Sequence, residues 1–358
     1  MIPVYKPRIY KDSVVKALES GWISSQGEFI QKATDSLKEF FSIPYVILMN
    51  NGTSATHMLL KALHFKYPSI KKLYVPNNVF VAVWNVVLYD NYFNMEVLEM
   101  DSKTLNIRTD EEYIQTLDKD SAVFIVHNVG NIVNVPRLKR LRPDLIFIED
   151  NCEGLFGKYE GLYSGMSEAS LCSACSFFGN KIITSGEGGA FFTHDKDVYD
   201  FIYSTIHHGL GTKQFVYSKL GYNYRMTNIQ AALLYDQMQN IQSTLQDKEK
   251  IFSYYRRMLN KNSIVYTKQE EGTLSANWMF IIGINIPYEK VNAYMKSKSI
   301  DTRPFFYDIQ THEHLKHIQR SNFELDLTYI ILPSYPDLTE KEISYISETL
   351  SKYLEVRG

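Results

Sequence analysis

Lys181 is the residue of this 358-residue chain whose type and setting most clearly suggest chemistry. It follows the apolar run 169–178 and precedes a turn that contains Gly186, Gly188 and Gly189. A lysine that only supplies surface charge does not need so many small residues beside it. In a crevice its amine is partly desolvated, which makes a lysine a nucleophile for carbonyl groups. Lys181 is therefore the candidate for a Schiff base.

Asp150 is a second candidate, because it stands just beyond the apolar run 145–148. Ligands of parallel α/β sheets bind beyond the carboxyl ends of the strands, so a carboxylate at such an end faces the ligand crevice. An Asp in this place can hold the protonated nitrogen of a pyridine ring. Considered alone, Asp150 is equally well explained as a solvated or helix-capping carboxylate.

The turn Asn51-Gly52-Thr53-Ser54 is a third feature, because it follows the apolar run 45–49 and opens a helical pattern. Free backbone N–H groups at a helix N-terminus bind phosphate, although Thr53 alone is equally well explained as a helix cap. No Gly-Lys-Ser/Thr follows this turn and no GxGxxG follows a strand, which disfavours a P-loop and a dinucleotide-binding domain. A phosphate cradle, an Asp and a Lys in this order predict a site for pyridoxal 5′-phosphate.

The other reactive side chains suggest simpler roles. Cys172 and Cys175 have CxxC spacing but lie in an apolar run without further ligands nearby, so we expect two buried residues. The three histidines of segment 311–317 fit no standard set of metal ligands, and we predict a solvated loop and no metal site. His208, in the sequence His207-His208-Gly209, is a candidate for a loop that lines the site.

The elements that must position these residues come from short apolar runs with helical segments between them, such as 54–65 and 79–89. Strands that alternate with helices indicate a mainly parallel sheet covered on both faces. The predicted strands are 45–49, 73–75, 95–99, 122–126, 145–148, 169–178 and 190–193.

The chain after residue 228 has a different pattern. Apolar residues keep helical spacing to residue 259, a stretch that we expect to bridge two domains or to bend near Gln246. Beyond it we predict strands at 278–286 and 329–332, a helix at 288–297, and a last helix that opens with the capping box of Thr339 and Glu342. The chain is thus predicted to form a large α/β domain (1–245) and a small α+β domain (246–358).

Composition excludes several classes of protein. With 38 Lys and Arg against 40 Asp and Glu, the net charge of −2 argues against a nucleic-acid partner. The N-terminus lacks the apolar core of a signal peptide, and no stretch is long and apolar enough to span a membrane. Three cysteines do not build a disulfide framework in a chain this long. We therefore expect a cytoplasmic protein without a membrane partner.

Several segments together resemble the nucleotide-sugar aminotransferases of the DegT/DnrJ/EryC1/StrS family, and most closely the perosamine and viosamine synthase branch. The resemblance covers nearly the whole chain and is most specific around Lys181. It implies an aspartate-aminotransferase-like fold (fold type I of the pyridoxal phosphate enzymes), with a seven-stranded mainly parallel sheet and a smaller C-terminal α+β domain. The matching segments are 21–27, 51–55, 149–150, 176–181, 221–226, 303–307 and 332–336.

The resemblance also implies roles for single residues. Lys181 carries the cofactor and Asp150 pairs with its ring nitrogen, and these two are the catalytic residues. Further cofactor contacts follow from the family pattern, with an aromatic ring on the cofactor face, a Glu near its phenolic oxygen, and an Asn that reaches the phosphate of a neighbouring subunit. The cofactor-binding set is Gly52, Thr53, Ser54, Phe80, Asp150, Glu153, Ser176, Lys181 and Asn223, and the weaker substrate-binding candidates are Trp22, Ser25, His208 and Tyr307.

The expected reaction moves an amino group from L-glutamate to C4 of a nucleotide-linked 4-keto-6-deoxy sugar, with pyridoxamine 5′-phosphate as the intermediate form of the cofactor. The expected assembly is a homodimer with shared active sites. The alternatives are a 3-aminotransferase, a 4-keto-amino-sugar aminotransferase, and a non-catalytic relative that binds a nucleotide sugar. Relatives that dehydrate their substrate have His in place of the Lys, so Lys181 argues against that chemistry.

The chain departs from the family pattern at two places, Asn151 with Cys152 after the Asp, and His127-Asn128-Val129 after the fourth strand. Both segments are expected to line the site. Nothing in the sequence selects UDP, dTDP or GDP as the nucleotide.

Overall fold

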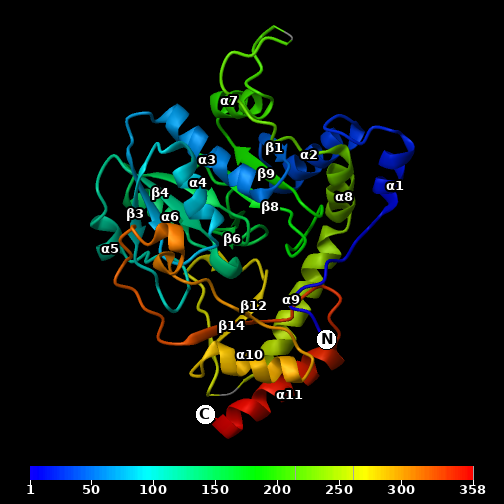
Figure 1. Ribbon diagram of the computed structural model, residues 1–358, viewed down its shortest axis with the longest axis vertical. Coiled ribbons are helices and arrows are strands. Elements are labelled where there is room, and N and C mark those ends of the chain that lie inside the picture. The colour runs from blue at the N-terminus through cyan, green and yellow to red at the C-terminus, as the bar shows by residue number, and fades with distance from the viewer. Residues whose placement is uncertain (214, 261, 358) are drawn as a thin grey trace.

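A seven-stranded sheet forms the centre of the computed structural model, which describes residues 1–213, 215–260 and 262–357 (Figure 1). The strand order is β1-β9-β8-β5-β4-β2-β3. Strand β9 runs antiparallel to both of its neighbours, and the other pairs are parallel. The strands are β1 (Tyr45–Met49), β2 (Lys72–Pro76), β3 (Asn94–Leu98), β4 (Ala122–Val126), β5 (Ile146–Asp150), β8 (Ser173–Ser176) and β9 (Gly189–Thr193).

All seven predicted strands are confirmed; those at 45–49 and 122–126 have the predicted ends, and the other five have shifted ends. Strand β5 extends to Asp150, so this carboxylate is the last residue of its strand and does not follow it. Strand β8 occupies only the middle of the predicted run 169–178. Most of the strands are apolar runs because both faces of the sheet are covered. Strand β4 is buried along its whole length, whereas the edge strand β3 exposes Asn94 and Glu96.

Helices cover the two faces of this sheet (Figure 1). One apolar core joins the sheet to α3, α4 and α7, and another joins it to α2 and α8. A third core lies under α5 and α6. The helices of this part are α1 (Asp12–Glu19), α2 (Glu28–Phe41), α3 (Gly52–Lys66), α4 (Ala82–Asp90), α5 (Glu111–Gln115), α6 (Val135–Leu141), α7 (Lys196–Ile206) and α8 (Asn228–Gln239), with a 3₁₀ turn η1 (Asn128–Gly130).

The long helical stretch is interrupted earlier than expected. Helix α8 ends at Gln239 and α9 (Ile241–Met258) begins after Asn240, so the bend predicted near Gln246 is wrong. Asn240 leaves the helical conformation (ψ +10°), and its side chain donates to the carbonyl of Asp236. Side chains of Asn, which bond to nearby backbone groups, favour such helix ends. Gln246 lies inside α9, where nothing interrupts the helix.

A second, antiparallel sheet lies below the first and has the order β10-β12-β14-β13 (Figure 1). It shares an apolar core with α9, α10 and α11, and α11 begins at the predicted capping box of Thr339 and Glu342. The elements of this part are β10 (Val265–Tyr266), β12 (Phe280–Ile284), α10 (Tyr288–Ser297), β13 (Arg303–Pro304), β14 (Thr328–Leu332) and α11 (Glu340–Arg357). Between β13 and β14, the 3₁₀ turns η2 (Ile309–Thr311) and η3 (Glu313–Leu315) pack instead against the core of the large sheet.

Strand pairing is one way in which this part is joined to the rest of the chain. Ile2 forms a bridge with Ile300, so the first residues lie beside the second sheet. A small third sheet pairs β11 (Thr273–Leu274) with β6 (Lys158–Tyr159), which pairs with β7 (Leu162–Tyr163). The division at residue 245 falls inside α9 and stays a prediction. In the described ranges, no helix is long and apolar enough to cross a membrane.

Candidate active site

One edge of the large sheet collects the residues that the sequence singles out. Strands β1, β8, β5, β4 and β2 all run in the same direction, because β9 is antiparallel to both β1 and β8. Their carboxyl ends therefore share an edge, and the chain at these ends carries the predicted chemistry. Gly52 follows β1, Ser176 ends β8, Asp150 ends β5, and Phe80 follows β2.

The turn after β1 forms a cradle against the end of β8. Asn51 caps α3, and its side-chain oxygen accepts a hydrogen bond from the backbone N–H of Ser54 at 2.8 Å. A Cβ atom on Gly52 would lie 2.6 Å from Cβ and 2.8 Å from Oγ of Ser176, so the close approach requires glycine. The first N–H groups of a helix have no partner within it. The N-terminus of α3 and the Ser176 hydroxyl together suit a phosphate group.

Asp150 is buried with only 5% of its surface exposed, and its oxygens have two donors. The hydroxyl of Thr56 donates to Oδ2 at 3.2 Å, and the backbone N–H of Cys152 donates to Oδ1 at 2.9 Å. The sequence reasoning missed Thr56. No local signal in the sequence marks it, because the contact depends on how α3 packs against β5.

Lys181 lies in the loop between β8 and β9 and points at two groups. Its Nζ atom is 3.9 Å from Oε1 of Glu153 and 4.1 Å from the ring centroid of Trp278. Lys181, Glu153 and Ser176 line one small cavity with Trp278. Sequence reasoning placed Trp278 only at the start of a strand, and nothing local in the sequence links it to Lys181.

Glu153 is a buried carboxyl beside the Lys181 amine. Burial raises its pKa from 4.5 to about 7, against the opposing effects of Lys181 and of the backbone N–H of Val129. That N–H donates to Oε2 at 2.8 Å. Val129 has a φ of +51°, which is rare for a β-branched residue. Segment 127–129, which departs from the family pattern, therefore contacts the site through its backbone.

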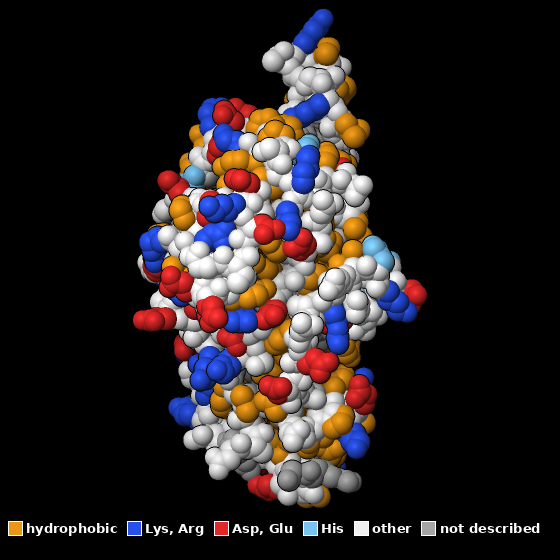
Figure 2. Space-filling view, turned by 90° about the vertical axis from the view of Figure 1, so that its left-hand side faces the viewer, with side chains coloured by type: hydrophobic (Ala, Val, Ile, Leu, Met, Phe, Trp, Pro, Cys, Tyr) orange, Lys and Arg blue, Asp and Glu red, His pale blue; other side chains and the backbone are white. Residues whose placement is uncertain are grey.

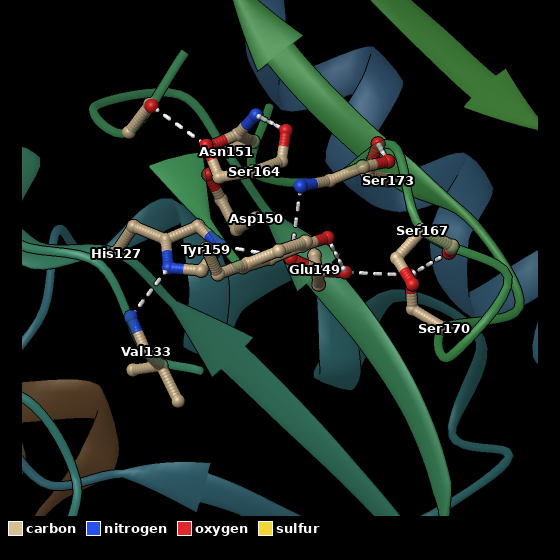
Figure 3. A network of polar contacts seen from close by, with 12 residues as sticks. His127, Val133, Glu149, Asp150, Asn151, Tyr159, Ser164, Ser167, Ser170 and Ser173 are labelled. Atoms are coloured by element: carbon tan, nitrogen blue, oxygen red, sulfur yellow. Dashed lines mark hydrogen bonds and ion pairs between the residues drawn. The ribbon is translucent and has the colours of Figure 1, made fainter. Parts of the chain in front are cut away.

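A buried polar network holds the end of β5 from the face opposite to Asp150 (Figure 3). Side chains alternate along a strand, so Glu149 points away from Asp150. Glu149 accepts hydrogen bonds from His127 Nε2 at 2.9 Å, the hydroxyl of Tyr159 at 3.2 Å and the hydroxyl of Ser170 at 2.6 Å. The backbone N–H of Gly165 is a further donor. All four donors fix the strand end that carries Asp150.

The tautomer of His127 in this network follows from its second ring nitrogen. Nδ1 accepts a hydrogen bond from the backbone N–H of Val133 at 3.1 Å, so the proton of a neutral ring is on Nε2 and is donated to Glu149. Both side chains are fully buried. The buried carboxylate is thus compensated by several donors, as buried charges in stable proteins are.

The residues at this edge fit pyridoxal phosphate. The Lys181 amine suits an aldehyde, the Asp150 carboxylate suits a ring nitrogen, and the space that glycine leaves between Gly52 and Ser176 suits a phosphate. Phe80 presents an aromatic ring that is 56% exposed, with its centroid 6.3 Å from that of Phe306. Tyr307 follows Phe306 and is half exposed.

Four predicted residues lie apart from this cluster. Trp22 and His208 are exposed, Ser25 is half-buried, and Asn223 is exposed with Oδ1 accepting from Arg225 Nε at 3.1 Å. They belong to the segments 21–27 and 207–225, and the hydrogen bonds, ion pairs and ring contacts of the described chain join none of them to Lys181. Their roles stay predictions.

The two cysteines are buried, as predicted, and most of the histidine segment is exposed. Cys172 and Cys175 are buried and unpaired. Segment 311–317 has His314 and His317 exposed, and His314 Nε2 lies 2.7 Å from Oδ1 of Asn85. Among the described residues, no group of three His, Cys, Asp or Glu side chains is placed to hold a metal ion.

Residues 8–351 match the DegT/DnrJ/EryC1/StrS aminotransferase family. GDP-perosamine synthase of Escherichia coli O157:H7 is 32% identical over 98% of this chain and 98% of its own length. GDP-perosamine synthase of Vibrio cholerae is 28% identical over 99% of each chain. Among solved structures, Helicobacter pylori PseC, an aminotransferase of pseudoaminic acid biosynthesis, superposes with a TM-score of 0.89 at 21% identity over 99% of each chain. This last likeness shows the fold.

Proposed function

The chain belongs to the DegT/DnrJ/EryC1/StrS aminotransferase family, and from this premise we propose that it transfers an amino group from L-glutamate to C4 of a nucleotide-linked 4-keto-6-deoxyhexose. The observation that carries the proposal is the edge where Lys181, Asp150 and the Gly52–Ser176 cradle meet. Full-length similarity to GDP-perosamine synthases supports C4 as the position and GDP as the nucleotide to test first.

Pyridoxal phosphate, when bound, supplies the group that carries the amine and a ring that withdraws electrons from the reacting carbon. Gly52, Thr53 and Ser54 of α3, with the Ser176 hydroxyl, hold its phosphate. The Asp150 carboxylate holds a proton on the ring nitrogen, and Thr56 and the N–H of Cys152 keep that carboxylate oriented.

Lys181 is the group that moves protons at the reacting carbons. Its Nζ takes a proton from the α-carbon of L-glutamate and, in the second half of the reaction, delivers one to C4 of the sugar. Glu153 and Trp278 flank this amine and exclude water from the side of the cavity that they line. The Phe80 ring is placed to cover one face of the cofactor.

The exposed apolar residues of one projecting part of the chain suit contact with a second copy of this chain. Segments 210–213 and 215–220 stand out from the body of the molecule (Figures 1 and 2). Phe215 and Leu220 in this projection are 79% and 81% exposed. Such apolar exposure marks interaction surfaces. Asn223 lies at the base of this projection, where it forms a bridge with His207, which supports a homodimer in which it reaches the phosphate bound by the other copy.

Two experiments test this function. Purified protein should be yellow and should lose the colour when L-glutamate is added, and Lys181→Ala should abolish turnover. Mass analysis and NMR of products from UDP-, dTDP- and GDP-linked 4-keto-6-deoxy sugars identify the substrate and the aminated carbon. An amino group found at C3, or a Lys181→Ala variant with normal transamination, would overturn the assignment.

The shared site has its own test. Lys181→Ala and Asn223→Ala are each expected to be inactive. Unfolding and refolding the two variants together should restore activity, because mixed dimers then contain one site with both residues intact. If the mixture stays inactive while each variant still forms dimers, Asn223 does not serve the neighbouring site.

A further inference from the structure

Lys248 is a fully buried lysine whose ammonium group has carbonyl groups for partners. It lies on α9 with 1% of its surface exposed. Its Nζ donates to the backbone carbonyl of Trp278 at 2.8 Å and to the backbone carbonyl of Ser334. Among the described residues, no carboxylate forms an ion pair with it. Burying an ammonium group without an anion is costly, so a chain that retains one gains something else from it.

Two of the residues around this ammonium group, Trp278 and Tyr5, also contact the Lys181 loop. The Trp278 ring lies 4.1 Å from Lys181 Nζ, and its indole N–H donates to the carbonyl of Asn180 at 2.8 Å. The hydroxyl of Tyr5 donates to the carbonyl of Lys181, and the Tyr5 ring centroid lies 5.9 Å from Lys248 Nζ. Trp278 and Tyr5 therefore connect the two lysines from two sides.

Lys248 also stands where four segments of the chain meet. The N–H of Ser334 donates to the carbonyl of Val4 at 3.3 Å, and its hydroxyl accepts from the N–H of Phe280 at 3.1 Å. One ammonium group thus joins α9 to the segment before β12 and to the segment after β14, beside the N-terminal residues. A displacement of any of these segments changes the place of Trp278.

We propose that Lys248 is a positioning residue of the active site, which holds the Trp278 carbonyl so that the indole ring stays against the Lys181 amine. The face of an indole ring attracts a cation and excludes water, so its place decides how the amine is held. The proposal rests on the proposed function, because it takes Lys181 as the reactive amine.

The strength of this contact depends on the charge of Lys248. Burial lowers its pKa from 10.5 to about 7, and burial is the one cause of the shift. Among the described residues, the ionisable groups nearby are Tyr5, Tyr255 of the same helix, whose hydroxyl donates to the carbonyl beside Ser334, and Lys181 beyond Trp278. The neighbouring carboxylates, Asp247 and Glu249, have partners elsewhere, in Arg8 and Asn277. An ammonium donates more strongly to a carbonyl than a neutral amine does, so the contact weakens as Lys248 loses its proton.

The test measures how fast Lys181 reacts with pyridoxal phosphate in the full-length chain stripped of cofactor. Samples are reduced with borohydride at successive times, and mass analysis quantifies the modified Lys181 peptide from about pH 6 to about pH 9. Lys248→Met, which lacks the donors, should react about tenfold more slowly at about pH 6. Lys61→Met is the matched control, because Lys61 is also buried but bonds to Asp90 and Tyr92 on another side of the molecule.

Lys248→Arg gives the sharper comparison, because arginine stays charged throughout this range. The ratio of the wild-type rate to the Lys248→Arg rate cancels the ionisation of Lys181 itself. We expect this ratio to fall as the pH rises through about 7. Tryptophan emission, taken as the difference from Trp278→Phe, should change over the same range in the wild type and not in Lys248→Arg.

Each outcome bears on one proposal. A ratio independent of pH, or a Lys248→Met variant that folds and reacts at the wild-type rate, overturns the positioning role and leaves the proposed function standing. If Lys248→Met does not fold, the Lys248→Arg ratio and the emission decide. If the Lys181→Ala variant forms the adduct on another lysine at the wild-type rate, Lys181 is not the reactive amine, and the proposed function is overturned instead.

Discussion

Replacing Glu153 by Gln should make the pH dependence of stability differ from that of the wild type by an amount that follows from burial. Glu153 is 7% exposed, 3.9 Å from Lys181 Nζ, and accepts one backbone hydrogen bond. Its pKa rises from 4.5 to about 7, with burial as the largest cause. At about 1.4 kcal/mol for each pKa unit, this rise corresponds to about 3 kcal/mol of free energy of unfolding.

The sign follows from the proton count in the two states. Below pH 4.5 both states hold the proton, and well above pH 7 both have lost it. Between these values the folded protein binds more protons than the unfolded chain, so the stability of the wild type falls as the pH rises. Gln does not titrate. The stability of Glu153→Gln relative to the wild type should therefore increase by about 3 kcal/mol across this range.

Urea unfolding of the cofactor-free proteins at a series of pH values measures this difference. Glu168→Gln is the matched control, since the Glu168 side chain is 84% exposed and its replacement should leave a curve parallel to the wild type. A constant difference between Glu153→Gln and the wild type would refute the argument. It would mean that Glu153 is solvated or that the Lys181 ammonium compensates its charge.

Three further substitutions test the geometry of the site. Gly52→Ala puts a methyl group 2.6 Å from Cβ of Ser176, so the dissociation constant of pyridoxal phosphate should rise at least tenfold in a spectroscopic titration, as expected for a loss of about 1.4 kcal/mol. Thr56→Val removes a hydroxyl donor from Asp150; the absorbance of the bound cofactor should titrate at a different pH than in Thr56→Ser, which keeps the donor. Glu149→Gln leaves buried donors without a full set of acceptors. It should lower the free energy of unfolding, measured by urea denaturation, by about 3 kcal/mol. A free energy of unfolding close to that of the wild type would mean that the network is open to water.

Local pattern predicted most of the architecture. Most strands of the large sheet are found because they are apolar runs that are buried on both faces, whereas the edge strand β3 is partly exposed. The capping box at Thr339 was found because its partners are three residues apart. The bend at Asn240 was missed, because apolar spacing continues across it and its helix-ending bond is made by one polar side chain.

The candidate site divides in the same way. Lys181, Asp150 and Gly52 were found because each follows or ends an apolar run, and parallel topology brings such ends to one edge. Thr56 was missed because a threonine in a helix carries no mark of what its hydroxyl meets. Its role depends on how α3 packs against β5, which no local pattern contains.

The sequence by itself determined which residue types stand at the strand ends, and therefore the class of cofactor that suits them. Only the tertiary structure decided how the reactive amine is surrounded. Tyr5, Lys248 and Trp278 come from three distant parts of the chain and meet beside Lys181. The burial that raises the pKa of Glu153 also comes from this packing. Strand ends follow from periodicity over a few residues, whereas burial and ring contacts depend on which distant segments pack together.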